Sequence, residues 1–153
     1  MSGIIQANAG EFLPAAIATE SLPPAERRTR LRDYINWVEE QLLEAPQAEA
    51  DLEHHLVDGL YTRTMRCPAG TTLTGAVHKR ASLTFLIEGE ISVLTEKGCA
   101  RLTAPLVFPS AAGIRRLGHC HTDVVWATVC ATAGTTLAEV EAELFEFVAP
   151  DEE

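Results

Sequence analysis

From Leu52 to about Thr132 the sequence is a series of short β-branched and aromatic runs, separated by turn residues such as Glu88-Gly89 and Pro109. Many short strands at this spacing indicate an all-β sandwich or barrel. The runs are LYTRTMR, TTLTGAVH, LTFLI, EISVLTE, ARLTA, LVFP and DVVWATVCAT. The sequence therefore predicts a mainly β domain over residues 52–132.

Helical periodicity flanks this β region on both sides. Apolar residues at three- and four-residue steps predict an amphipathic helix over 21–46, which Pro46 ends, and a second over 135–148. Thr136 and Glu139 are placed to form a capping box for the second helix. The first apolar stripe consists of Leu31, Tyr34, Ile35, Val38 and Leu42, and the second of Leu137, Val140, Leu144 and Phe147. With a single stripe each, both helices are expected to lie on the β domain or on another copy.

Residues 1–20 are small, apolar and aperiodic, and their first charge is Glu11. Such a segment cannot form a core of its own, so we interpret it as an extended arm, either disordered or docked on a neighbouring subunit. It lacks the basic start of a signal peptide. No apolar stretch approaches the ~20 residues of a membrane span, and no membrane partner is predicted.

The net charge of −10 argues against nucleic acid as a partner, because nucleic-acid-binding surfaces concentrate Lys and Arg. The four cysteines, Cys67, Cys99, Cys120 and Cys130, form no C-x-x-C pair. This spacing argues against a zinc knuckle or a thioredoxin-like motif. Free thiols in a reducing cytoplasm are therefore expected.

The segment HKRASLTFLIEGEISVLTEKG resembles the first sequence motif of the cupin superfamily, and LVFPSAAGIRRLGH is similar to the second. The resemblance covers residues 70–132. It implies a cupin-like antiparallel jelly-roll barrel, flanked here by an N-terminal and a C-terminal amphipathic helix. Cupin barrels commonly pair through their sheets, so the resemblance and the apolar arm together predict a homo-oligomer of closed symmetry. Dimer and trimer are not distinguished.

Metal-binding cupins take two His and one Glu from the first motif and one His from the second. The corresponding positions here are Ala76, His78, Ser82 and Arg116, so one of the four ligands is retained. A divalent metal needs three or four N or O donors, and a guanidinium has no lone pair to give. We therefore predict that His78 is a structural residue of the barrel interior, hydrogen-bonded to Thr74 or Ser82, and that the cavity holds no metal.

A metal-dependent cupin enzyme acting on a small molecule or a sugar is the alternative hypothesis. His119 and His121 share a face if Gly118–Asp123 starts the strand that continues into VVWATV. Together with His78 they would make three ligands for Fe, Mn, Ni or Zn. Arg116 would then hold an anionic substrate; otherwise it is expected to form an ion pair with Glu88 or Glu90, or with a neighbouring subunit.

A longer resemblance, from about Leu31 to Leu144, is to small cupin-domain proteins encoded by tailed bacteriophages. It implies a non-enzymatic structural or interaction protein of the virion, head- or tail-associated, that is made in the host cytoplasm and contacts other virion proteins. The sequence predicts no catalytic residue and no cofactor-binding residue for this role. A small-molecule binding module that uses the barrel interior without chemistry is the third class of function.

Overall fold

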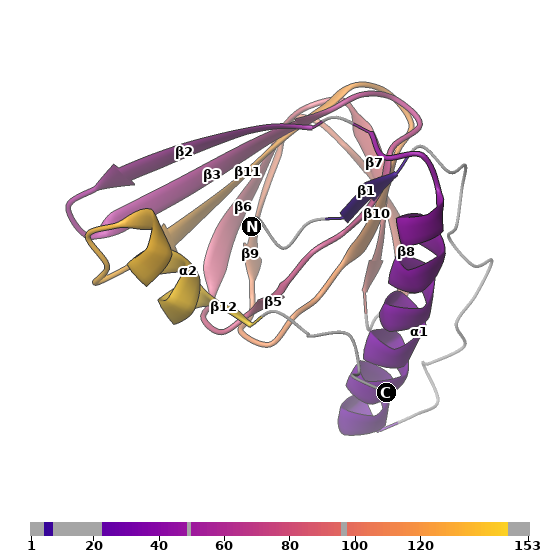
Figure 1. The fold of residues 1–153 in the computed structure, drawn as a ribbon, viewed down its shortest axis with the longest axis horizontal. Coiled ribbons are helices and arrows are strands. Elements are labelled where there is room, and N and C mark those ends of the chain that lie inside the picture. Colours follow the sequence, from indigo (N-terminus) through magenta and orange to yellow (C-terminus); the bar gives the residue numbers. More distant parts are fainter. Residues whose placement is uncertain (1–4, 8–22, 49, 96–97, 147–153) are drawn as a thin grey trace.

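The computed structural model describes residues 5–7, 23–48, 50–95 and 98–146. The main feature of the fold is a pair of five-stranded antiparallel sheets (Figure 1). In spatial order, the first sheet contains β1 (Ile5–Ala7), β4 (Thr72–Thr74), β10 (Leu117–Cys120), β7 (Glu90–Thr95) and β8 (Gly98–Thr103). The second sheet contains β2 (Asp51–Val57), β3 (Leu60–Cys67), β11 (Val124–Ala131), β6 (Ser82–Glu88) and β9 (Leu106–Ser110). The protein is thus mainly β, with antiparallel sheets.

The facing sides of the two sheets form the central hydrophobic core. Alternation along each strand turns every second side chain inward, and the inward residues of both sheets pack in one cluster. Its buried members are Met65, Cys67, Leu73, Leu86, Ile91, Val93, Cys120 and Val124. The alternate side chains of the first sheet face the opposite way, toward the long helix.

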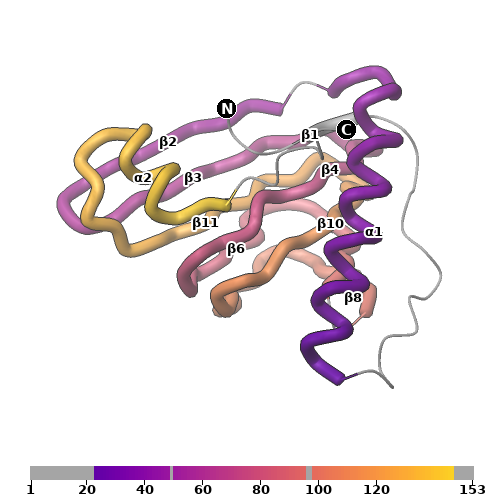
Figure 2. Tube along the Cα trace, turned by 60° about the horizontal axis from the view of Figure 1, so that its bottom comes forward, coloured from indigo at the N-terminus to yellow at the C-terminus, as the bar shows by residue number. Residues whose placement is uncertain are grey.

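The long helix α1 (Pro24–Glu44) lies along the first sheet (Figure 2). Its buried side chains Leu31, Ile35, Val38 and Leu42 pack against Leu94 of β7 and Leu117 of β10. Ala45, directly before Pro46, is extended and not helical, as the proline predicts. Neither helix of the described chain has the length and apolar character needed to cross a lipid bilayer.

The short helix α2 (Leu137–Leu144) packs where β3 begins and β11 ends, against Tyr61 and Cys130. The Thr136 hydroxyl accepts a hydrogen bond from the Glu139 amide, so the predicted N-cap is confirmed. Val140 and Leu144 are buried, whereas Leu137 of the predicted stripe is exposed, and Phe147 lies outside the described residues. After α2, the strand β12 (Phe145–Glu146) pairs with β5 (Val77–His78).

The predicted N-terminal arm, residues 1–20, lies outside the described residues except for Ile5–Ala7. These three residues form β1, which pairs antiparallel with β4 of the same chain. For these three residues the pairing partner is β4 of their own chain, and the extended arm over residues 1–20 stays a prediction.

Candidate functional site

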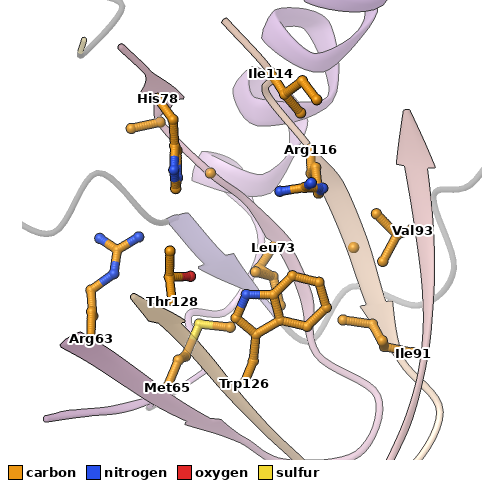
Figure 3. Close-up of a pocket in the computed structure, with 13 residues that line it drawn as sticks. Arg63, Met65, Leu73, His78, Ile91, Val93, Ile114, Arg116, Trp126 and Thr128 are labelled. Atoms are coloured by element: carbon orange, nitrogen blue, oxygen red, sulfur yellow. The ribbon is translucent and has the colours of Figure 1, made fainter. Parts of the chain in front are cut away.

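A small cavity of about 70 Å³ lies between the two sheets (Figure 3). Its apolar wall includes Met65, Leu73, Ile91, Val93 and Ile114. Its polar lining includes Arg63, His78, Arg116, Trp126 and Thr128. Figure 3 shows the guanidinium groups and the imidazole approaching the cavity from different sides, because each comes from a different part of the fold.

Arg116 directly precedes β10, and its guanidinium turns into the cavity. Its Nη2 donates a hydrogen bond to Ser110 Oγ at 2.6 Å, and its Cζ lies 5.6 Å from the centre of the Phe108 ring. Ser110 is itself hydrogen-bonded to Thr84 of β6 at 3.0 Å, which fixes the acceptor. Burial lowers the pKa of Arg116.

Within the described part of the chain, no carboxylate lies within ion-pair distance of Arg116. The expected pairing with Glu90 is wrong, because Glu90 forms its ion pair with Arg101 at 2.8 Å. The adjacent Arg115 forms an ion pair that the sequence did not predict, with Glu39 of α1 at 2.8 Å. The two consecutive arginines therefore face opposite sides of the first sheet.

Arg63 lies on β3 in the second sheet, and its side chain is almost fully buried. Its Cζ lies 4.8 Å from the centre of the Phe145 ring of β12, a distance at which the ring face attracts a cation. Burial lowers the pKa of Arg63, while Tyr61, Cys130 and Glu141 act in the opposite direction. Arg63 thus contributes a second positive charge to the cavity.

His78 lies on β5, and its ring makes an edge contact with Phe145 at a centroid distance of 5.1 Å. Burial, Arg63 and Arg116 together lower the pKa of His78 to about 4, so its imidazole is neutral at pH 7. The predicted hydrogen bonds to Thr74 and Ser82 are wrong. The Thr74 hydroxyl donates to Glu39, and the Ser82 hydroxyl is buried with no partner among the described residues.

His119 and His121 lie close together, with ring centroids 5.3 Å apart, but among the described residues they form no possible metal-binding group with His78. His119 Nδ1 is hydrogen-bonded to Thr72 Oγ1 at 2.8 Å, and His121 Nε2 to Ser92 Oγ at 2.6 Å. His119 is two residues from Leu117, which contacts α1, and therefore shares the outer face of the first sheet.

The segment Gly118–Asp123 does not continue as one strand into VVWATV, so that expectation is wrong. The chain leaves β10 of the first sheet after Cys120 and enters β11 of the second sheet at Val124. The structure therefore separates His119 and His121 from His78.

The cavity does not fit a divalent metal, because its lining offers one imidazole and the Thr128 hydroxyl, fewer than the three or four donors needed, and its two guanidiniums have no lone pair to donate. Across the described residues, no group of three or more His, Cys, Asp and Glu side chains is placed to hold a metal ion. We therefore derive no metal chemistry for this cavity.

Arg63 is the cavity residue that the sequence analysis missed. In the run LYTRTMR it alternates with Tyr61 and Met65, which both turn inward on β3. A cation at an inward position between two apolar residues is uncommon in a β core, because a buried charge needs compensation. The place of Arg63 between two inward apolar residues is therefore the sequence pattern that could have identified it as a cavity residue.

The His78 pKa predicts a pH-dependent stability. The unfolded chain takes up a proton near the ordinary pKa of 6.5, but the folded chain does so only near 4, so the unfolded state binds more protons between these values. Stability should fall by about 2 kcal/mol from pH 7 to pH 5 on this account. His78→Gln should remove that part of the pH dependence while changing stability little at pH 7.

Urea unfolding of both proteins at pH 7 and pH 5 measures the difference, in which the other titrating groups cancel. His55→Gln is a matched control, because His55 is exposed. Parallel pH profiles for the wild type and His78→Gln would contradict the buried neutral state of His78.

No family model matches the sequence, and no curated protein matches it. Among solved structures, an acetylacetone dioxygenase from Acinetobacter johnsonii aligns at a TM-score of 0.48 and 14% identity, over 63% of this chain and 77% of that chain. The EutQ protein of Clostridium difficile aligns at 0.48 and 11% identity, over 57% of this chain and 71% of that chain. A cupin superfamily protein from Desulfitobacterium hafniense DCB-2 aligns at 0.48 and 11%, over 60% and 84% of the two chains. Each alignment covers only part of this chain, and one of the three solved structures is that of a cupin superfamily protein.

Proposed function

We propose that this protein is a non-enzymatic interaction protein with a cupin-type jelly-roll barrel that acts as a homo-oligomer. By its sequence resemblance, we assign it to the particle of a tailed bacteriophage. Two features support the cupin assignment. The first is that His78 and Arg116, which stand at ligand positions of the two cupin motifs, line one cavity. The second is the pair of helices beside the strands. The flanking helices α1 and α2 each bury an apolar set of side chains against the strands.

The apolar outer face of the second sheet is the main observation that supports an interaction protein. On β6, Leu83 and Ile87 are 47% and 50% exposed, and Val107 of β9 is 56% exposed. Leu83 lies opposite Val129, and Phe85 lies opposite Val107, so these side chains adjoin across three strands. Leu83, Phe85, Val107 and Val129 therefore form a continuous apolar face, which indicates a contact surface.

A second copy of the chain is the partner that we assign to this apolar face. The chain carries a net charge of −10, yet Leu83, Phe85, Val107 and Val129 bring no charge to the face. A partner must therefore match an uncharged surface. Another copy supplies an identical surface, and a two-fold interface joins the same patch on both subunits. Residues Ile5–Ala7 give less support to oligomerisation than this face does, because β1 pairs within its own chain.

The variant Leu83→Lys/Val107→Lys tests the oligomer. We expect the wild type to sediment and scatter light as a dimer or larger assembly, and the variant as a monomer, because two buried lysines would lie unpaired in the interface. Leu43→Lys on α1, where Leu43 is 60% exposed, is the matched control and should not change the mass. A monomeric wild type at micromolar concentration would contradict the proposal.

The virion assignment is tested by mass spectrometry of purified phage particles. We expect peptides of this chain in the particle at a fixed ratio to the major capsid or tail proteins. A protein abundant in the infected host cytoplasm but absent from the particles would contradict a virion role and would leave the oligomer unaffected.

A further inference from the structure

We propose that the cavity between the sheets binds a small organic carboxylate, held by Arg116, Arg63 and His78. The three side chains come from three segments: the residue before β10, strand β3 and strand β5. In Figure 3 both guanidiniums and the imidazole surround the same space. The inference goes beyond the interaction role proposed above and does not depend on it.

Arg116 supplies the strongest reason for an anion. Arg116 is half-buried, and a cation withdrawn from water is costly unless an opposite charge or several hydrogen bonds compensate it. The described structure gives Arg116 one hydroxyl, Ser110 Oγ at 2.6 Å, and one ring face, that of Phe108. Both are neutral, and the remaining N–H donors of a guanidinium suit the two oxygens of a carboxylate.

The positive charge of Arg116 is also held in place before a ligand arrives. The hydroxyls of Thr84 and Ser110 share a hydrogen bond that joins β6 to β9. This bond orients the Ser110 hydroxyl, which accepts a hydrogen bond from Arg116. A donor that is already oriented loses less conformational freedom on binding. Side-chain entropy therefore opposes anion binding less here than it would for an arginine on the surface.

His78 suits the same ligand in its neutral form. Its ring makes no hydrogen bond to any described residue, and its lining position leaves it available to the cavity. A neutral imidazole has one N–H donor for a carboxylate oxygen. The low pKa of His78, which follows from burial and from both arginines, is the response expected of a base in a positive cavity. A bound anion should therefore raise that pKa.

Cavity size and wall chemistry select the class of anion. A volume of about 70 Å³ has room for roughly five water-sized groups. The carboxylate needs three of these, and the apolar wall of Met65, Leu73 and Val93 favours a short hydrocarbon part for the rest. A carboxylic acid of two or three carbons fits better than inorganic phosphate or sulfate, which would place oxygens against that wall.

Titration of the full-length protein with sodium acetate, propionate and butyrate tests the inference, with phosphate, sulfate and chloride at matched ionic strength for comparison. Trp126 lines the cavity and is one of two tryptophans, so a Trp37→Phe protein gives a fluorescence signal from the site alone. We expect saturable binding of at least one carboxylate with a Kd below about 1 mM. We also expect a higher melting temperature on binding.

Arg116→Met should weaken carboxylate binding at least about tenfold, the cost of losing charge-assisted hydrogen bonds. Arg116→Lys keeps the charge and should retain part of the affinity, and it serves if the methionine variant does not fold. Arg101→Met is the matched control, since Arg101 is exposed and lies outside the cavity. No saturable binding of any carboxylate up to about 10 mM, or an unchanged Kd in Arg116→Met, would overturn the inference. Equal affinity for phosphate would overturn the choice of carboxylate.

Discussion

Replacing Arg115 by methionine is expected to lower the free energy of unfolding by about 3 kcal/mol, the loss seen when one partner of a buried ion pair is removed. Arg115 is only 4% exposed. Its Nη2 donates to Glu39 Oε2 at 2.8 Å, its Nη1 donates to Asn36, and its Nε donates to the Gly75 carbonyl at 2.8 Å. Its loss would leave the Glu39 carboxylate without a cation, held only by the Thr74 hydroxyl, and the Gly75 carbonyl without its side-chain donor, where α1 meets the first sheet.

The same substitution at Arg116 should raise the free energy of unfolding of the ligand-free protein or leave it unchanged. Arg116 has no carboxylate partner in the described structure, so methionine removes a half-buried, unpaired charge and breaks one hydrogen bond to Ser110. Replacing a buried charge by an apolar side chain of similar length is often neutral or stabilising by about 1–2 kcal/mol. Urea unfolding of both variants in carboxylate-free buffer measures the difference. A loss at Arg116 as large as that at Arg115 would show that Arg116 serves mainly in folding.

Gly89→Ala is the second substitution with a large expected effect, a loss of about 3 kcal/mol or more. Gly89 joins β6 to β7 with a φ of +92°, and a Cβ there would lie 2.1 Å from the carbonyl oxygen of Asp123. Backbone strain and a collision with backbone act together, and neither relaxes through a side-chain rotation.

Gly98→Ala separates the two causes for Gly89. Gly98 also has a positive φ, +109°, but a Cβ there would meet no described atom within 4 Å. We expect it to cost about 1 kcal/mol, from strain alone. Thermal unfolding of both variants measures the contrast, and equal losses would mean that the contact with Asp123 contributes nothing.

The strands were predictable from sequence where apolar alternation and turn residues coincide. Gly89 is an example: the Glu88-Gly89 turn predicts the end of one strand and the start of the next, and β6 and β7 meet there. β2 was not among the predicted runs, because its burial alternates only weakly between exposed and half-buried positions. Its partner β3 is what makes it a strand, and pairing between segments is not visible in local periodicity.

The candidate site was predictable only in part. His78 and Arg116 were identified through the cupin motifs, and the structure places both on the cavity. Arg63 comes from a strand outside those motifs, and it reaches the cavity only because the second sheet packs face to face with the first. The grouping of His119 and His121 with His78 depended on one strand running through residues 118–123. A change of sheet within three residues, which no local pattern signals, places them on the other side of the first sheet.

Phe145 has a consequence for the C-terminal end of the described chain. It is the residue of β12 that pairs with His78, and its ring also lies beneath Arg63. One side chain of β12 thus contacts two residues that line the cavity, His78 and Arg63. Filling the cavity and the docking of β12 on β5 are therefore thermodynamically linked. Exchange of the Lys79 amide hydrogen, which is donated to the Leu144 carbonyl directly before β12, should slow when the cavity is filled.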